Sequence, residues 1–517
     1  MLLVVAPRLA LDAGITWDEP AQLEYGNRVL AWFRSAGRDT SALSYRDLYL
    51  YGGLFDLPAQ WLVSLLPFPP ADTRHVLTAL VALLGVVATW LCANSIAGAR
   101  AGFIAALVLV LTPAWSGHGM FNPKDIPFGA AAAFVTYTSV RIALAPAPLA
   151  WGDALRVAVA LGMALGVRAG GMFLAVYPLL AAGGRALSDA CERVRRGEPA
   201  RLGQSAARTL LRLLCVAPVS WAIMISAWPW AQLSPFLRPL EAAVGAQRFV
   251  WDNPVFFDGK YLPATELPWT YLPTWFAITL PETYLLATLC GGVGLGYWLV
   301  ERRWRSLEAP RALALIVLVA AVFAPLAGVL IKRPVLYDAQ RHFLFILPPL
   351  AALAGLAFEV FFVEAALRRM RAVGVAAVAL PALLVGIDMA RLHPYEYVYF
   401  NRVSGGLPAA YGHFETDYWG AAYGEAFAWV NAHTRHPTGA QIRIAACFGM
   451  DQLRYYLRWT SGAQARFVLA NDEADADIIL AFTRFNCHAT RGRLIHVVRR
   501  EGVPLVYVLE RPSPKRK

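Results

Sequence analysis

Apolar residues along this chain gather in long runs that short polar segments separate. About 20 apolar residues in a helix cross the hydrocarbon core of a bilayer, and ten runs approach or exceed that length. Several are short, and the pair on either side of Arg168 fits a bent hairpin. The runs lie at 76–97, 101–117, 127–145, 154–167, 169–184, 209–228, 271–299, 312–331, 342–363 and 373–390. This pattern predicts an α-helical polytopic membrane protein.

The opening stretch, Met1–Leu11, is also apolar but short. As a helix it would rise about 16 Å, roughly half a bilayer. It has neither a basic start nor a small-residue cleavage site, so it does not fit a signal peptide. We expect it to be the end of a truncated first span, which brings the expected total to about 11 spans.

After residue 390 the pattern changes to short alternating stretches and turn residues, which are typical of strands. Two further stretches, 420–434 and 450–458, favour helices. The predicted strands are Ile442–Phe448, Ala465–Ala470, Ala476–Phe482 and Leu494–Leu509, the last as a hairpin around Glu501-Gly502. The sequence therefore predicts two domains: a multi-span domain over 1–390, with a first outer loop at 12–75, and a small C-terminal α/β domain over 391–517.

Composition supports a bilayer protein, because 58% of the residues are hydrophobic and only 16% are charged. Soluble domains are about a quarter charged. The net charge of +12 raises the question of nucleic-acid binding. The arginines, however, cluster in short segments between apolar runs, at Arg185–Arg212, Arg302–Arg311 and Arg368–Arg371. The positive-inside rule already explains such clusters, so we predict no nucleic-acid partner.

Threading the spans with these clusters in the cytoplasm places five segments outside: 12–75, 118–126, 229–270, 332–341 and 391–517. We therefore expect a multi-pass protein of a bacterial-type inner membrane, with a periplasmic C-terminal domain. Only two cysteines, Cys447 and Cys487, fall in that domain. Whether they form a disulfide depends on their distance in the fold, and the sequence leaves this open.

The first candidate for chemistry is the pair Asp18 and Glu19, just outside the truncated span. A carboxylate before Pro20 is an ordinary way to start a helix, with a cap followed by proline. A helix start uses one carboxylate, so it explains less well why two carboxylates stand side by side. A general base for a hydroxyl must be a carboxylate or an imidazole near the acceptor, and Asp18 is placed to be one.

Asp18-Glu19-Pro20 followed by Tyr25 resembles the Asp-Glu-x-x-x-Tyr pattern in the first outer loop of the GT-C superfamily. More narrowly, it is similar to glycosyltransferase family 39, the relatives of protein mannosyltransferases and aminoarabinose transferases. The resemblance implies a polyprenyl-phosphate sugar as donor and an acidic catalytic residue in this loop. It therefore implies catalytic roles for Asp18 and Glu19, with Tyr25 near the substrate.

The second candidate is a tight outer loop at 118–127 that contains Asn-Pro and Ile-Pro. Such pairs mark turns and helix starts, and a lysine at a span end often snorkels to the surface. Its polar residues nevertheless lie at the depth of a lipid phosphate, and Asn-Pro-Lys-Asp resembles bacterial family 39-like transferases. We expect substrate binding by His118, Asn122, Lys124 and Asp125, with Lys124 as the phosphate ligand.

Cations elsewhere add to this set. Arg168 interrupts an apolar stretch, where a charge is expensive; it fits a buried ion pair, a hairpin tip or a substrate ligand. Arg341 ends the outer loop 332–341, which is rich in cations contrary to the inside rule, and His342 follows it. Guanidinium groups suit phosphate oxygens. Many family 39 members carry Lys-Pro-Pro-Leu late in the first loop, whereas this chain has Tyr51-Gly52-Gly53-Leu54 in the comparable stretch. Lys124, Arg168 or Arg341 would have to replace that lysine.

Taken together, these residues predict an inverting glycosyltransferase of the cell envelope that transfers a sugar from polyprenyl phosphate to an acceptor hydroxyl. The acceptor, whether protein, lipid or glycan, stays open. A membrane transporter or lipid flippase is the alternative, although the polar clusters lie at one face rather than at mid-span. No cofactor is implied with certainty; Mg²⁺ or Mn²⁺ is left open, because no full ligand set is visible. Glu415 and Asp417, among aromatic residues of the C-terminal domain, fit packing better than acceptor binding.

Overall fold

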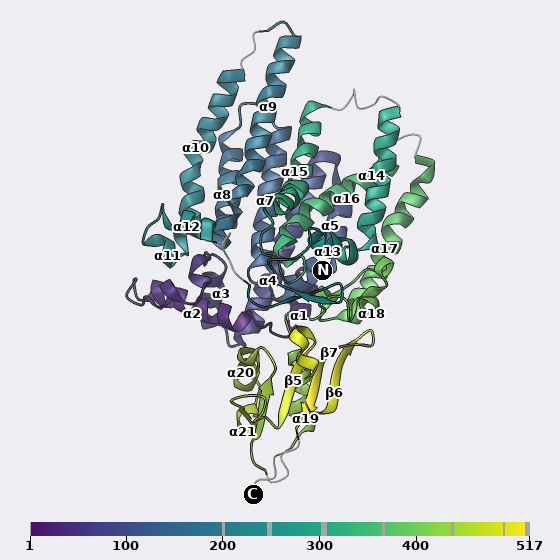
Figure 1. Cartoon of the computed structure of the whole chain (residues 1–517). Coiled ribbons are helices and arrows are strands. Elements are labelled where there is room, and N and C mark those ends of the chain that lie inside the picture. Colours follow the sequence, from purple (N-terminus) through teal and green to yellow (C-terminus); the bar gives the residue numbers. More distant parts are fainter. Residues whose placement is uncertain are drawn as a thin grey trace.

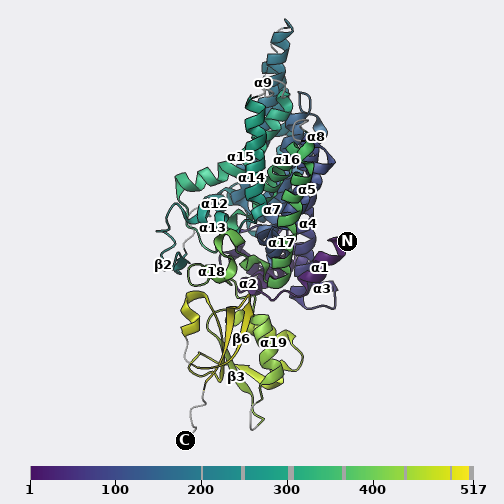
Figure 2. The same cartoon turned by 90° about the vertical axis from the view of Figure 1, so that its right-hand side faces the viewer.

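The computed structural model describes residues 2–198, 202–245, 251–300, 308–363, 368–435, 439–489 and 492–511. A bundle of long helices forms most of the molecule, and a small sheet domain lies against one end of it (Figures 1 and 2). Within the described residues, seven helices are long and apolar enough to cross a membrane, or nine if each of two bent pairs counts as one span. The predicted fold class is confirmed, whereas the total of eleven spans stays a prediction.

Each of the ten predicted runs is helical. The helices of the bundle are α4 (Pro70–Ala97), α5 (Ala99–Val110), α6 (Pro113–Phe121), α7 (Asp125–Leu144), α8 (Trp151–Val167), α9 (Val176–Arg195), α10 (Leu202–Ser226), α13 (Tyr271–Thr279), α14 (Glu282–Val300), α15 (Ala309–Lys332), α16 (Leu347–Val363) and α17 (Arg371–Leu392). Two helices, α1 (Leu2–Ala10) and the 17-residue α8, are shorter than the seven clear spans.

Two of the predicted spans are broken. The axis bends by 64° between α5 and α6 and by 98° between α13 and α14. Pro113 opens α6, and Pro281 stands between α13 and α14. Proline supplies no amide hydrogen and disfavours helical geometry in the residue before it, so each proline ends the preceding helix. Each break falls within a continuous apolar run, so the pattern of apolar residues did not predict it.

The segments that the sequence predicts as outer loops form short elements at the end of the bundle nearest the sheet domain (Figure 1). The first loop contains α2 (Glu19–Arg34) and α3 (Asp56–Leu65), with 3-10 turns η1 (Ser41–Ser44) and η2 (Leu48–Leu50) between them. A later loop holds α11 (Pro229–Gln232), α12 (Arg238–Gly245) and a hairpin of β1 (Val255–Phe257) and β2 (Lys260–Leu262). The sequence patterns had not predicted this hairpin.

The sheet domain contains five strands in the order β4-β3-β5-β7-β6. β3 lies parallel to β4 and β5, while β7 pairs antiparallel with β5 and β6. The strands are β3 (Ile442–Ala446), β4 (Phe467–Leu469), β5 (Ile478–Phe482), β6 (Arg493–Arg500) and β7 (Val503–Glu510), and the helices are α19 (Tyr423–His433), α20 (Met450–Trp459) and α21 (Ala463–Arg466). The predicted strands, hairpin and helices are therefore confirmed.

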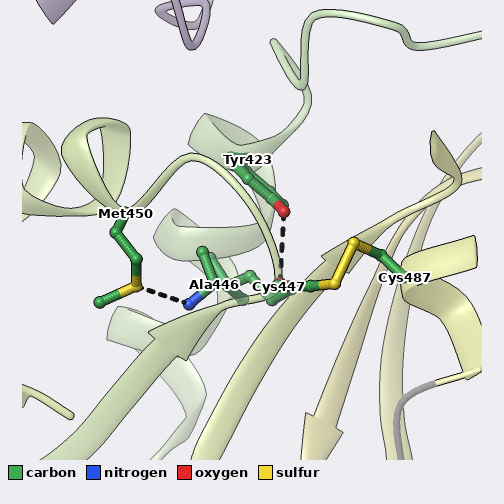
Figure 3. The surroundings of a disulfide bond; sticks show 6 residues. Tyr423, Ala446, Cys447, Met450 and Cys487 are labelled. Carbon is green, nitrogen blue, oxygen red and sulfur yellow. Dashed lines mark hydrogen bonds between the residues drawn. A yellow bond between two sulfur atoms is a disulfide. The ribbon is translucent and has the colours of Figure 1, made fainter. Parts of the chain in front are cut away.

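The disulfide that the sequence left open is present. It joins Cys447, after β3, to Cys487 in η10 (Arg484–Ala489), with the two Cα atoms 5.7 Å apart (Figure 3). Beside it, the Ala446 amide donates to the Met450 sulfur at 3.2 Å. The disulfide therefore connects the end of β3, a central strand, to η10, the segment that carries Arg484.

Hydrogen bonds to and from side chains of α20 hold the sheet domain against the first predicted outer loop. The Gln452 side chain donates to the Ile15 carbonyl at 2.8 Å, and the Ile15 amide donates to the Tyr456 hydroxyl at 2.9 Å. The Ala71 amide likewise donates to the Tyr455 hydroxyl at 3.0 Å. Buried apolar residues form one cluster that continues across residue 390, so the division into two domains stays a prediction.

Candidate active site

A cavity of about 570 Å³ lies between the helical bundle and its outer loops. Its lining comes from many separate segments of the chain. They include the residue before α2, the end of η2, the α6–α7 loop, the α8–η3 break, α12, the segment 334–337 and the start of η6 (Arg341–Ile346). Seven of the ten predicted site residues line it: Asp18, Asn122, Lys124, Asp125, Arg168, Arg341 and His342. Residues from distant parts of the sequence therefore meet in one hollow.

Asp18 is held by an arginine and does not cap a helix. It precedes α2, but its side chain makes no capping hydrogen bond. Its Oδ2 instead accepts a hydrogen bond from Nη1 of Arg341 at 3.2 Å, and 34% of the side chain is exposed. The helix-start explanation of Asp18 is therefore not supported. The carboxylate is oriented by a cation and remains accessible from the cavity.

Glu19 has different surroundings from its neighbour. It is buried, and its Oε1 lies 2.6 Å from Nε2 of His75 in α4. Its Oε2 accepts the Thr16 amide hydrogen at 2.6 Å. Glu19 is not among the residues that line the cavity. Its position fixes the start of α2 against α4, so Asp18 is the member of the pair that can meet a substrate there.

Tyr25 and His118, the other predicted residues outside the lining, support residues within it. The buried Tyr25 hydroxyl donates to the Tyr51 carbonyl at 3.0 Å. Nε2 of His118 lies 2.9 Å from the Tyr418 hydroxyl, and Nδ1 lies 3.2 Å from the Asn122 side-chain nitrogen. These contacts position cavity residues without facing the cavity themselves.

Arg341 lies at the centre of a buried ion network. Its Nη2 is 2.9 Å from Oδ2 of Asp338, and its guanidinium group stacks on Trp419, 4.7 Å from the ring centre. Asp338 is fully buried and also contacts Arg484, from the sheet domain, at 2.5 Å. Burial would raise the pKa of the Asp338 carboxyl, but Arg484 and Arg341 outweigh it and hold the pKa below its ordinary value. The network fixes the direction of Arg341 towards Asp18.

Lys124 and Arg168 meet over one aromatic ring. The Lys124 ammonium lies 4.0 Å from the centre of the Tyr51 ring, and the Arg168 guanidinium lies 5.9 Å from it. Tyr51 opens the stretch Tyr51-Gly52-Gly53-Leu54, which contains no lysine. Lys124 and Arg168, from two other loops, thus supply positive charge beside Tyr51.

The backbone after Tyr51 approaches α8 so closely that only glycine fits. A Cβ on Gly52 would lie 2.0 Å from the Gly166 carbonyl oxygen. The Leu54 amide then donates to the same carbonyl at 3.2 Å. Gly52 therefore sets how near Tyr51 lies to Arg168, which follows α8 directly.

The loop before α7 is stabilised by the Asn122 side chain. Its Oδ1 accepts the amide hydrogens of Lys124 and Asp125 at 3.2 and 2.9 Å, and its Nδ2 donates to the Asp125 carboxylate at 2.8 Å. Asp125 also forms a buried ion pair with Arg168. Of the alternatives for Arg168, the ion pair is therefore present, and the same side chain lines the cavity.

Several donors at this cavity have no acceptor. Nε of Arg168 and Nε of Arg341 are buried without a hydrogen-bond partner among the described residues. The Lys124 ammonium has no ion pair within the same described ranges. Buried donors are normally satisfied, so unsatisfied cationic donors around one hollow indicate an anionic ligand.

One flank of the cavity is apolar. Phe128 of α7, Phe173 of η3 (Ala169–Ala175) and Phe345 of η6 line it. Phe345 packs against both other rings, with centroid distances of 5.5 Å, and 39% of Phe173 is exposed. The cavity therefore offers a cationic wall and an aromatic, lipid-like wall side by side.

A metal site is not evident in the part of the chain that the structure describes. It holds no group of three His, Cys, Asp or Glu side chains placed to bind a metal ion. The two buried or half-buried carboxylates at the cavity, Asp18 and Asp125, are each paired with an arginine. A divalent cation would have to compete with those arginines.

Sequence reasoning missed several residues of the site. Tyr51 was noted only for the absent lysine, and Tyr337 and Asp338 only as members of a cation-rich loop. Arg484 gave no signal, because its partner Asp338 lies 146 positions earlier in the chain. The unusual density of cations at 332–341 was the one sequence feature that marked this region.

No family model matches this sequence, and no curated protein matches it either. Among solved structures, ArnT from Cupriavidus metallidurans bound to undecaprenyl phosphate is similar, with 15% identity and a TM-score of 0.47 over 98% of this chain and 96% of that one. The Archaeoglobus fulgidus oligosaccharyltransferase in the apo form has 14% identity and a TM-score of 0.45, covering 92% of this chain. This chain spans 65% of its length. The resemblance to the GT-C superfamily, which rests on the motif around Asp18, therefore stays a prediction.

Proposed function

We propose that this protein transfers a sugar from a polyprenyl-phosphate donor to an acceptor hydroxyl at the cavity around Asp18. The observation that carries the proposal is the meeting of three features in one hollow. These are an accessible carboxylate, cations with unsatisfied donors, and an apolar flank. A lipid-linked phosphate sugar needs all three.

The donor phosphate would bind between Lys124, Arg168 and Arg341. Guanidinium groups form strong charge-assisted hydrogen bonds with phosphate oxygens, and an ammonium group adds a point charge. The unsatisfied Nε atoms of the two arginines supply donors that no described protein group uses. The lipid chain would leave along the wall of Phe128, Phe173 and Phe345, which avoids exposing it to water.

In the transfer step, the acceptor oxygen attacks the anomeric carbon of the donor sugar. Asp18 takes the proton of the acceptor hydroxyl as general base. The bond from the anomeric carbon to the phosphate oxygen breaks, and the phosphate keeps the electron pair. The cations stabilise this departing charge, as an oxyanion hole does. A single displacement of this kind inverts the anomeric configuration.

One carboxylate is sufficient for this chemistry. A glycosidase needs a second carboxyl group to protonate an alcohol leaving group. A lipid phosphate leaves as an anion and needs cations instead, which is the composition of this cavity. The sheet domain and the first outer loop would then lie on the periplasmic side of a bacterial-type inner membrane, where the acceptor arrives.

The test is Asp18→Asn in purified protein reconstituted in nanodiscs. Undecaprenyl-phosphate hexoses and pentoses labelled in the sugar are offered with membrane extract as acceptor source, and loss of label from the lipid is followed. We expect Asp18→Asn to lower transfer by about 10²- to 10⁴-fold, the usual contribution of a general base. Binding of undecaprenyl phosphate should persist.

The matched control is Glu24→Gln, a carboxylate of the same helix that pairs with Arg28 at 2.8 Å and does not line the cavity. Its activity should equal that of the unaltered protein. Full transfer by Asp18→Asn would remove Asp18 from the mechanism. Movement of labelled lipid across the bilayer without any loss of sugar would favour the flippase alternative.

A further inference from the structure

A second cavity, of about 290 Å³, lies beside the β1–β2 hairpin. The hairpin contacts residues 411–416, since Phe257 bridges to Phe414 and the Gly259 amide donates to the His413 carbonyl at 2.9 Å. Thr483 and Arg484, at the end of β5, complete the wall. Binding pockets commonly span about 300–1,000 Å³, so this volume suits a single small ring.

The polar centre of this cavity is the carboxylate of Glu415. Only 2% of the side chain is exposed. Its Oε1 accepts hydrogen bonds from Nε of Arg484 at 3.2 Å and from the Phe256 amide at 3.4 Å. Its Oε2 is buried and has no hydrogen-bond partner among the described residues. A buried carboxylate oxygen without a donor is costly, so a ligand that brings a donor would be favoured.

The charges at the cavity oppose an ionic ligand. Arg484 already compensates Glu415, and its Nη2 contacts the buried Asp338. An anion would be repelled by the two carboxylates and a cation by the guanidinium group. The hydroxyls of Thr416 and Thr483, 3.2 Å apart, add neutral polar groups to the lining. A neutral molecule with hydroxyl donors fits this set best.

Aromatic rings form the rest of the wall. Tyr261 and Tyr411 line the cavity and are 44% and 37% exposed. Phe256 lies 4.8 Å from the Tyr261 ring, and the Tyr411 hydroxyl lies 3.1 Å from that of Tyr507. Exposed rings beside a hydrogen-bonding centre suit a ligand with one apolar face and polar edges. A pyranose has this shape, with C–H groups on its face and hydroxyls at its rim.

We propose that the second cavity binds a neutral pyranose unit, with ring stacking on Tyr261 and a sugar hydroxyl donating to Glu415 Oε2. The ions Arg484, Asp338 and Arg341 link this cavity to Asp18 through contacts of 2.5, 2.9 and 3.2 Å. The site is therefore separate from the transfer cavity but connected to it. It does not depend on the transfer reaction. Assigning the bound ring to the acceptor glycan would rest on the proposed function.

Direct binding to the full protein in nanodiscs tests this proposal. Saturation-transfer NMR is recorded with methyl α-D-mannopyranoside, methyl β-D-glucopyranoside and methyl β-D-galactopyranoside, and with glucosamine and glucuronic acid as charged comparators. At least one neutral glycoside should bind more tightly than either charged sugar. Tyr261→Ala should weaken binding by about 2- to 10-fold, the usual effect of losing one aromatic contact. Glu415→Gln should weaken it by about 10- to 100-fold, because a hydrogen bond to a charged group is lost.

Trp269→Ala is the matched control, since Trp269 is 66% exposed near the hairpin and does not line the cavity. Its binding should be unchanged. Asp18→Asn should also bind normally, which separates this site from the transfer chemistry. Tyr261 is at the surface, so its variant remains informative even if Glu415→Gln fails to fold. Absence of binding to every neutral glycoside, binding of glucosamine alone, or binding that Tyr261→Ala leaves unaltered would overturn the proposal.

Discussion

The two ends of the helical bundle differ in whether arginine side chains are buried. At the end beside the sheet domain, the side chains of Arg74, Arg341 and Arg484 are 3%, 9% and 1% exposed, and each contacts a carboxylate. At the other end, where α9 ends and α10 begins (Figure 1), the side chains of Arg195 and Arg208 are exposed. Exposed arginines are sufficient to set membrane topology. Buried ones must be compensated, so they belong to a structure built around a site.

This difference teaches that net charge alone is not informative about function here. Removing a charge from water costs several kcal/mol unless a partner and hydrogen bonds replace the solvent. The buried arginines, which carry this desolvation cost, lie at the end of the bundle that contains the cavity. Four predictions follow the contrast between the two ends, and each compares a variant at the cavity end with a control elsewhere.

The largest effect on stability is expected from Asp338→Asn. Asp338 is fully buried between Arg341 and Arg484, so its loss leaves two guanidinium groups without their shared anion. Breaking a buried ion pair costs about 3–5 kcal/mol of unfolding free energy. Unfolding in mixed micelles with increasing dodecyl sulfate measures the change.

The control for this variant is Asp189→Asn in α9, at the opposite end. Its partner Arg193 is 3.2 Å away, and the two side chains are 34% and 21% exposed. A pair of this kind contributes about 0–1 kcal/mol. Equal losses of unfolding free energy in the two variants would show that the buried ion pairs at the cavity end stabilise the protein no more than the exposed pair does.

Lys124→Gln should have the next largest effect, on activity rather than stability. The ammonium lines the cavity without an ion pair among the described residues, so removing it should leave the fold intact. Loss of one stabilising group at a departing oxyanion lowers kcat by about 10²- to 10³-fold. Arg195→Gln removes a charge from the other end and should keep full activity. A drop in both variants would point to general electrostatics instead of phosphate binding.

Tyr51→Leu tests the aromatic platform beneath the two cations. A cation over a ring gains about 0.5–2 kcal/mol, so affinity for undecaprenyl phosphate should fall by roughly 2- to 30-fold. Tyr45→Leu is the comparison, because Arg28 lies 4.3 Å from that ring outside the cavity. If the Tyr45 variant loses the same affinity, the Tyr51 ring has no special role.

The smallest expected effect is a pH dependence of the unfolding free energy that comes from His393. Its Nδ1 lies 2.8 Å from Glu396 and its Nε2 3.3 Å from Asp12. The hydrogen bond to Glu396 outweighs burial and raises the pKa of His393 above 6.5. Stability from this group is therefore fully present below pH 6.5 and is lost as the pH rises through the higher pKa of the folded state.

His393→Gln should accordingly lower the unfolding free energy at pH 5.5 and change it little at pH 9. The side chain is 23% exposed, so we expect no more than about 1 kcal/mol. His413→Gln, an exposed histidine of the same region, should not alter the pH profile. A His393 effect that is equal at both pH values would contradict the ion pairs.

The sequence by itself determined the class of the protein and its elements. Ten apolar runs became ten helical regions, and alternation after residue 390 became the five-stranded sheet. These features depend on local periodicity, which each stretch carries within its own residues. The resemblance to the GT-C superfamily likewise depends on a short motif around Asp18. This motif lies in one of the loops that meet at the cavity.

Only the tertiary structure separated the two adjacent carboxylates. Asp18 and Glu19 are neighbours in sequence, but one side chain contacts Arg341 at the cavity and the other contacts the buried His75. It also brought Arg484 to Asp338 across 146 positions and placed Lys124 over Tyr51. Contacts of this kind depend on how helices and the sheet domain pack, and no local pattern encodes a partner so far away in the chain.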